Sequence, residues 1–154
     1  MTVPAVGAVA PDFSIDATSG SKRTLAEYRG KQHVLLAFFP LAFTSTCTAE
    51  LCAFNDDFDA FSRADVVVIP ISVDAVASLG AFKEQHDMSV ELASDFHRTV
   101  SRAYGVLNEE RFFAKRSYFL IDKTGIVRWS FVETHNGTRR ENAELLAEIA
   151  KLTG

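Results

Sequence analysis

Two continuous apolar runs divide the first half of the chain. Residues 34–39 and residues 66–71 carry no polar side chain, which fits strands covered on both faces better than strands wetted on one. Each run is followed by apolar residues at helical spacing, over residues 47–63 and 75–86. An order of strand, helix, strand and helix is typical of a parallel sheet. The pattern therefore predicts an α/β protein.

The helix predicted over residues 47–63 has one apolar stripe. Large apolar side chains recur there at spacings of four and three residues, which places them on one face together with Cys47. The members of the stripe are Leu51, Phe54, Phe58 and Phe61. Cys52 lies roughly 140° round a regular helix from Cys47. We therefore expect Cys52 near solvent and Cys47 on the buried side.

Shorter signals complete the N-terminal and middle parts of the chain. Residues 13–16 alternate apolar and polar side chains, as a half-buried strand does. Thr24 and Glu27 have the spacing of a capping box, which predicts a short helical turn. Pro70 has no backbone N–H to donate, so we expect the second apolar strand to bulge or to end early at this residue.

The C-terminal part predicts a hairpin followed by a helix. Residues 118–122 and 126–131 are strand-like and are separated by a turn that contains Gly125. We expect these two strands to close the sheet in antiparallel fashion. Thr138 and Glu141 have the spacing of a second capping box, before a final helix. The residues expected to face the core from that helix are Leu145, Leu146, Ile149 and Leu152.

Length and charge limit the organisation and the partners of the protein. The 154 residues contain no internal repeat, low-complexity tract or linker, so we predict one domain over residues 1–154. The net charge of −4 and the absence of a segment rich in Lys and Arg argue against nucleic acid as a partner. The longest apolar stretch, residues 34–43, is too short to cross a membrane.

The N-terminal residues show no basic segment followed by a sustained apolar run, which a secretory signal requires. We therefore expect a cytoplasmic protein, although a secreted protein whose signal had been removed would have the same sequence. Two cysteines are too few for a four-ligand zinc site, and the four histidines show no paired ligand spacing. We therefore expect no structural metal.

The segment around the two cysteines carries the candidate chemistry. A strand-like run ends at Pro40, hydroxyl-bearing residues follow, and Cys47 comes where a helix begins. Free N–H groups and the positive end of the helix dipole favour a thiolate over a thiol at such a position. In a cytoplasmic protein, a close pair of cysteines is more often catalytic than structural. Cys47 is therefore the candidate nucleophile.

Pro40, Thr44 and Cys47 stand at the offsets of a P-x-x-x-T-x-x-C pattern. This pattern, together with residues 10–13 and 116–122, resembles the peroxiredoxins, and the match extends over essentially the whole chain. The resemblance implies a thioredoxin-like fold, in which helices flank a central mixed β-sheet. It also implies that Cys47 is the peroxidatic cysteine, that Thr44 orients peroxide and thiolate, and that Pro40 shields the pocket.

Two further residues take roles from the same resemblance. Arg116 is similar to the arginine whose guanidinium lies beside the reactive sulfur, and Glu50 is similar to a residue that helps to hold that arginine. As the O–O bond of a peroxide breaks, negative charge grows on the leaving oxygen, and fixed donors there lower the barrier. Arg116 and Thr44 would supply such donors.

Two resemblances imply different roles for Cys52, and both stay open. The spacing of Cys47 and Cys52 is similar to that of the bacterioferritin-comigratory and Q-type peroxiredoxins, which implies that Cys52 attacks a Cys47 sulfenic acid to form an intramolecular disulfide. Five helical residues rise about 7.5 Å, so the first helical turns would have to unwind before this bond forms. Residues 39–44 also resemble one-cysteine peroxiredoxins of the alkyl hydroperoxide reductase E type, in which no cysteine matches Cys52.

The resemblance therefore implies a thiol-dependent peroxidase that reduces hydrogen peroxide and organic hydroperoxides and uses no cofactor, whether metal, haem or flavin. Thioredoxin or a similar dithiol is the expected reductant, and the expected state is a monomer or a homodimer. Two alternatives stay open: a one-cysteine peroxidase that depends on an external thiol, and a non-catalytic redox-sensing or holdase module on the same scaffold. A general thiol–disulfide oxidoreductase is disfavoured, because the chain has no C-x-x-C motif.

Overall fold

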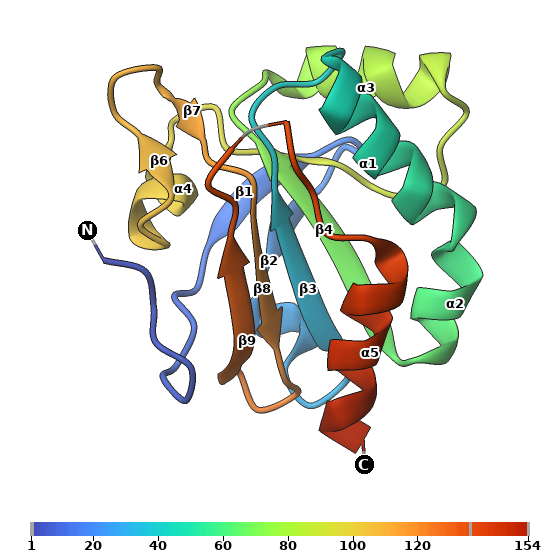
Figure 1. Cartoon of the computed structure of the whole chain (residues 1–154). Coiled ribbons are helices and arrows are strands. Elements are labelled where there is room, and N and C mark those ends of the chain that lie inside the picture. Colours follow the sequence, from blue (N-terminus) through green and yellow to red (C-terminus); the bar gives the residue numbers. More distant parts are fainter. Residues whose placement is uncertain (1, 136, 154) are drawn as a thin grey trace.

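The computed structural model describes residues 2–135 and 137–153, and its centre is a mixed β-sheet (Figure 1). Within those residues seven strands join in the order β2-β1-β5-β4-β3-β8-β9. The strands are β1 (Ser14–Ala17), β2 (Lys22–Thr24), β3 (His33–Phe38), β4 (Val66–Ser72), β5 (Ala93–Ser94), β8 (Ser117–Ile121) and β9 (Val127–Val132). Because β3 pairs in parallel with β4 and antiparallel with β8, the predicted mixed sheet is confirmed.

Helices cover both faces of this sheet (Figure 1). They are the 3₁₀ turn η1 (Ala26–Tyr28), α1 (Ser45–Asp56), α2 (Phe58–Arg63), α3 (Val76–Gln85), α4 (Thr99–Ala103) and α5 (Asn142–Thr153), and a separate ribbon pairs β6 (Leu107–Asn108) with β7 (Phe113–Ala114). All six residues of β3 are buried. Leu35 and Ala37 pack on the side of α1, α2, α3 and α5, whereas Leu36 and Phe38 pack on the side of α4. A strand covered on both faces is what the apolar run predicts.

Pro70 lies inside β4 without interrupting it. Residues 66–71 pair with β3 one by one. The Ile71 carbonyl accepts the N–H of Phe39 on the β3 side, so the backbone of the neighbouring Pro70 points to the opposite edge. β5 pairs with β4 there only at Ile71 and Ser72. The expected bulge or early end is wrong, because no paired strand requires an N–H from Pro70.

The helix predicted over residues 47–63 is two helices, α1 and α2, separated by Asp57 at φ −101° and ψ 19°. Asn142 holds this break, because its Nδ2 donates 2.8 Å bonds to the Ala53 carbonyl and to the Asp57 carboxylate. The change of direction takes Phe58 off the apolar stripe and leaves it 43% exposed, so its predicted burial is wrong. The other members of the stripe are buried as predicted: Leu51, Phe54 and Phe61.

The last helix begins later than its capping pattern predicts. α5 begins at Asn142, after Glu141, whose carbonyl accepts the N–H of Leu145 at 3.1 Å. The Thr138 hydroxyl instead faces two acceptors, the buried Glu133 carboxylate at 3.0 Å and the His135 carbonyl at 2.9 Å. The predicted second capping box is therefore wrong, because the Thr138 hydroxyl bonds to residues that precede it and not to the start of α5. The predicted inward face is confirmed, with Leu145 and Ile149 buried and Leu146 and Leu152 packed against the same cluster.

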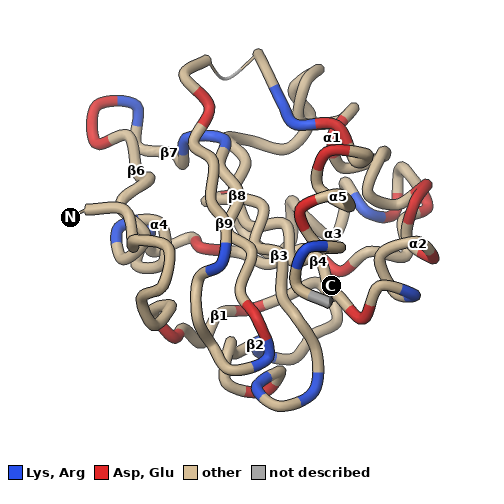
Figure 2. The backbone as a smooth tube through the Cα atoms, turned by 60° about the horizontal axis from the view of Figure 1, so that its bottom comes forward, with Lys and Arg blue, Asp and Glu red and all other residues tan. Residues whose placement is uncertain are grey.

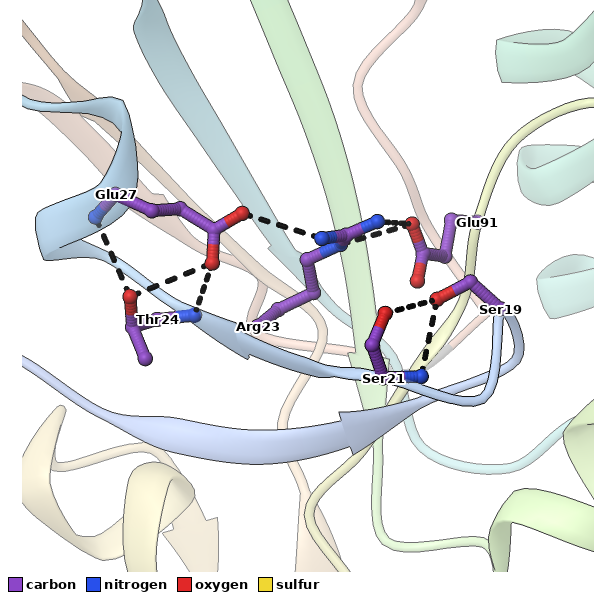
Figure 3. Close-up of polar contacts among 6 residues, drawn as sticks. All are labelled: Ser19, Ser21, Arg23, Thr24, Glu27 and Glu91. Carbon is purple, nitrogen blue, oxygen red and sulfur yellow. Dashed lines mark hydrogen bonds and ion pairs between the residues drawn. The ribbon is translucent and has the colours of Figure 1, made fainter.

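The first capping box is confirmed beside η1 (Figure 3). The Thr24 N–H donates to the Glu27 carboxylate at 2.9 Å, and the Glu27 N–H donates to the Thr24 hydroxyl at 3.3 Å. Arg23 lies between Glu27 and Glu91, and its Nη2 is 2.7 Å from the Glu91 carboxylate. The ion pair between Arg23 and Glu91 therefore connects β2 to the segment that precedes β5.

Charged residues of both signs are distributed over the molecule (Figure 2). Several meet as ion pairs between neighbouring segments, as Arg102 and Glu109 do at 2.9 Å. Among the helices within the described residues, none is long and apolar enough to cross a bilayer.

Candidate active site

Cys47 lies in the first turn of α1. Residues 39–44 connect β3 to this helix, and Thr44 is its N-cap. Cys47 is only 1% exposed. The N–H groups of a first helical turn have no acceptor within the helix, and the helix dipole is positive there, so this end of the helix stabilises a nearby negative charge. The predicted position of Cys47, buried at a helix start, is confirmed.

Arg116 reaches Cys47 because of the pairing between β3 and β8. Phe38 at the end of β3 is opposite Ser117 at the start of β8. Arg116 therefore lies beside the C-terminal end of β3, where the chain leaves the sheet toward α1. Its Nη2 donates to Cys47 Sγ at 2.9 Å, and its Nη1 donates to Glu50 Oε1 at 2.8 Å. One guanidinium therefore binds the sulfur and a carboxylate together.

Glu50 connects Arg116 to a tyrosine outside the predicted site. The Tyr118 hydroxyl donates to the second oxygen of Glu50 and accepts the N–H of Arg140 at 3.0 Å. Burial raises the pKa of Tyr118, so this hydroxyl stays protonated and remains a donor. Tyr118 stands two residues after Arg116, inside β8, and packs in the same cluster as Cys47. Its spacing of two residues from Arg116 is the sequence signal that could have identified Tyr118.

The charges of this buried cluster act on one another. Burial opposes the charged form of Arg116, but the charges of Glu50 and Cys47 raise its pKa above the ordinary value. Burial raises the pKa of the Glu50 carboxyl, and the charge of Arg116 works against that rise. Arg139 lowers the Glu50 pKa as well, to a smaller extent. The guanidinium therefore stays charged and can donate to an anionic sulfur.

Thr44 and Pro40 lie in the connection between β3 and α1. Pro40 is buried, and Thr44 is exposed at the N-cap. The Thr44 hydroxyl donates to the Leu41 carbonyl at 2.8 Å, so the side chain folds back over this connection. The structure thus brings both residues to the start of the helix that carries Cys47. Their roles toward a peroxide stay predictions.

Replacing Thr44 with valine should slow the reaction of Cys47 with peroxide by about 10²-fold, because the predicted role of Thr44 is to supply a hydroxyl where charge develops. Thr44→Ser keeps the hydroxyl and should stay within about tenfold of the unchanged protein. Stopped-flow measurement of Cys47 oxidation gives both rates. Equal rates for the valine and serine variants would contradict the assigned role.

Asp74 fixes the connection that precedes α1. Its Oδ2 accepts the N–H of Ala42 at 2.9 Å and the hydroxyl of Ser72 at 2.6 Å. Phe43 has a φ of 70°, a left-handed conformation that costs about 1–3 kcal/mol outside glycine. Its ring packs edge-on against Phe82, with the centroids 5.1 Å apart. Tertiary contacts therefore hold a strained backbone next to the N-cap. Asp74 was not predicted as a site residue, because no local sequence pattern indicates its contact with Ala42.

Cys52 is half-buried and therefore less exposed than expected. Its Sγ lies 3.9 Å from Nδ1 of His86, at the end of α3. Both cysteines are free thiols. Burial, with a contribution from the charge of Asp56, raises the pKa of the Cys52 thiol. The two sulfurs thus differ: Cys47 belongs to the apolar core and bonds to a guanidinium, whereas Cys52 lies outside it beside an imidazole.

The surroundings of Cys47 suit attack on a peroxide oxygen, because the sulfur lies at the positive end of a helix and 2.9 Å from a guanidinium donor. On a thioredoxin-like sheet, this site defines a thiol peroxidase. Comparison with known proteins identifies the group within that class: the chain belongs to the AhpC/TSA family, whose model matches residues 6–130. The resemblance to peroxiredoxins is confirmed, and the protein is a thiol-dependent oxidoreductase.

Relatives of three kinds illustrate the match. Alkyl hydroperoxide reductase E from Mycobacterium tuberculosis is 41% identical over 127 residues, which cover 81% of this chain and 83% of that protein. Peroxiredoxin Bcp from Bacillus subtilis is 35% identical over 136 residues, which cover 83% of this chain and 86% of that protein. The crystal structure of reduced 2-Cys peroxiredoxin from Plasmodium vivax superposes with a TM-score of 0.90 at 31% identity, covering 96% of this chain and 81% of that one.

Proposed function

We propose that the protein reduces hydrogen peroxide and organic hydroperoxides at Cys47, that Cys52 then forms a disulfide with Cys47, and that thioredoxin or a similar dithiol restores both thiols. The observation that carries the proposal is the 2.9 Å bond from Arg116 to the sulfur of Cys47 at a helix start. The relatives named for alkyl hydroperoxide reduction support organic hydroperoxides as substrates. The exposed ring of Phe43, next to Thr44, offers apolar surface to such a substrate.

The first step consumes the peroxide. The Cys47 thiolate attacks one peroxide oxygen, an S–O bond forms, and the O–O bond breaks. The other oxygen leaves with the electron pair of that bond and takes up a proton, which gives water or an alcohol. Arg116 supplies donors for the charge that grows on this oxygen, and the Thr44 hydroxyl would supply another after turning away from the Leu41 carbonyl. The product on Cys47 is a sulfenic acid.

The second step uses Cys52. Its sulfur attacks the sulfur of Cys47, an S–S bond forms, and the hydroxyl group of the sulfenic acid leaves as water. Five residues of a helix rise about 7.5 Å, whereas bridged Cα atoms usually lie within about 7 Å. The first turns of α1 therefore unwind before the disulfide forms. The Bcp relative supports this route, and the alkyl hydroperoxide reductase E relative keeps a one-cysteine cycle with an external thiol as the second candidate.

Replacing Cys52 with serine tests the route. After one equivalent of peroxide, the unchanged protein should lose both thiols and form an intramolecular disulfide. Cys52→Ser should instead keep a sulfenic acid on Cys47, which dimedone traps, and its turnover with thioredoxin should fall by about 10²-fold or more. A stable sulfenic acid in the unchanged protein would establish the one-cysteine cycle. Failure of both proteins to consume peroxide would favour the non-catalytic module.

The proposed reductant bears on where the protein is located, and its exposed aromatic rings bear on its oligomeric state. A dithiol donor operates in a reducing compartment, which supports the cytoplasm as the location. A monomer contains every residue of the proposed cycle, and the exposed rings of Phe43, Phe96 and Phe112 would suit an isologous homodimer. Sedimentation at several protein concentrations distinguishes these two states.

A further inference from the structure

Cys52 meets a titratable side chain from another helix. Its Sγ is 3.9 Å from Nδ1 of His86, which is the C-cap residue of α3. Both side chains are half-buried, so the contact is partly shielded from water. The Cys52–His86 pair is distinct from the hydrogen bonds that join Arg116 to Cys47 and to Glu50.

The imidazole of His86 is held in place. Its ring packs against Phe82 with the centroids 4.5 Å apart, and its backbone N–H donates to the Phe82 carbonyl at 3.1 Å. Phe82 is completely buried and also contacts the ring of Phe43. The histidine therefore keeps a defined position against the core and presents Nδ1 to Cys52.

The half of α1 that carries Cys52 is tied to the segment after α3. The Asn55 side-chain carbonyl accepts the N–H of Ser89 at 2.6 Å and the N–H of Val90 at 3.2 Å. These bonds lie on the far side of Cys52 from the first turns of the helix. On the proposed route, these bonds would keep Cys52 beside His86 while the first turns unwind and Cys47 approaches.

Attack by Cys52 requires the removal of its proton. The thiolate is the nucleophile in such exchanges, whereas the thiol is inert. Burial and the charge of Asp56 raise the pKa of Cys52, so the thiol form dominates at neutral pH. A base within reach of the sulfur would supply the thiolate when the sulfenic acid arrives. Nδ1 can accept the proton when the ring carries its own hydrogen on Nε2.

We propose that His86 is the general base of the resolving step, a role that rests on the proposed function of Cys52. Nδ1 takes the proton of the Cys52 thiol, and the sulfur attacks the sulfur of the Cys47 sulfenic acid. The S–S bond forms as the S–O bond breaks, and the departing hydroxide takes the proton from the imidazolium to become water. No further oxidant or reductant enters this step.

Replacing His86 with glutamine tests the base directly. Glutamine retains hydrogen-bonding groups beside Cys52 but accepts no proton at neutral pH. The sulfenic acid of the His86→Gln variant should live about 10²-fold longer than that of the unchanged protein. Dimedone trapping at timed delays after one equivalent of hydrogen peroxide measures this lifetime. The oxidation of Cys47 in the same samples shows that the variant is folded. His97→Gln, at an exposed histidine that packs against Phe96, is the matched control.

A second variant separates proton transfer from packing. His86→Ala should resolve as slowly as His86→Gln, and added imidazole should restore its rate as the concentration increases. A wild-type lifetime in His86→Gln would overturn the inference while leaving the resolving role of Cys52 intact. Slow resolution without rescue by imidazole would show a packing role and would also overturn it. A stable sulfenic acid in the unchanged protein would overturn the resolving role and the inference together.

Discussion

Replacing Cys47 with serine should abolish peroxide reduction, with a loss of at least about 10³-fold in rate. Serine is close to cysteine in size, so the 1% exposed position and the Arg116–Glu50 ion pair should persist. The hydroxyl stays protonated at the helix start, however, because neither the dipole nor one guanidinium suffices to make an alkoxide. The nucleophile is therefore removed while the site around it stays intact. Peroxide consumption in the presence of thioredoxin and its reductase measures the effect.

The matched control for Cys47→Ser is Cys52→Ser. That variant retains the sulfur beside Arg116 and should react with the first equivalent of peroxide at the unchanged rate. If Cys47→Ser consumed peroxide as fast as Cys52→Ser, the reactive sulfur would not be Cys47.

Replacing Arg116 with methionine should have the second largest effect, on both rate and stability. Nη2 is the donor to Cys47 Sγ, so its loss should slow the reaction with peroxide by about 10²–10³-fold. Glu50 would lose its cation in a buried position, which costs about 3–5 kcal/mol. Stopped-flow oxidation gives the rate, and urea unfolding gives the free energy of unfolding.

A second substitution distinguishes the two effects. Combining Arg116→Met with Glu50→Gln removes the buried negative charge and should recover much of the lost stability, because glutamine can still bond to Tyr118. The rate should stay low, since the donor to the sulfur is still absent. Recovery of the rate together with the stability would show that Arg116 acts through folding alone.

The sequence predicts those parts of the fold and the site that depend on local pattern. The apolar run of β3 and the helix start at Cys47 are both local, and each is confirmed. Arg116 is distant in sequence, and only its resemblance to a family suggests the contact with Cys47. The structure supplies the physical reason, which is the pairing of Phe38 with Ser117.

The errors arise where a tertiary contact overrides a local signal. Phe58 follows the helical stripe, but the bonds from Asn142 at the start of α5 stabilise a break at Asp57. Thr138 has the spacing of a cap, but its hydroxyl binds Glu133. Pro70 is tolerated because β5 is too short to pair with it. Each outcome depends on a residue or strand that the local window does not contain.

Time-resolved mass spectrometry tests most directly whether the Cys47 sulfur is the atom that attacks the peroxide oxygen. The reduced protein is mixed with one equivalent of hydrogen peroxide, quenched at increasing delays and digested. We expect Cys47, located by fragmentation of the peptide that contains both cysteines, to gain one oxygen atom at the earliest times, and this species to decay as Cys47 and Cys52 become linked. First appearance of the added oxygen on Cys52, or peroxide consumption with both thiols unchanged, would contradict this expectation.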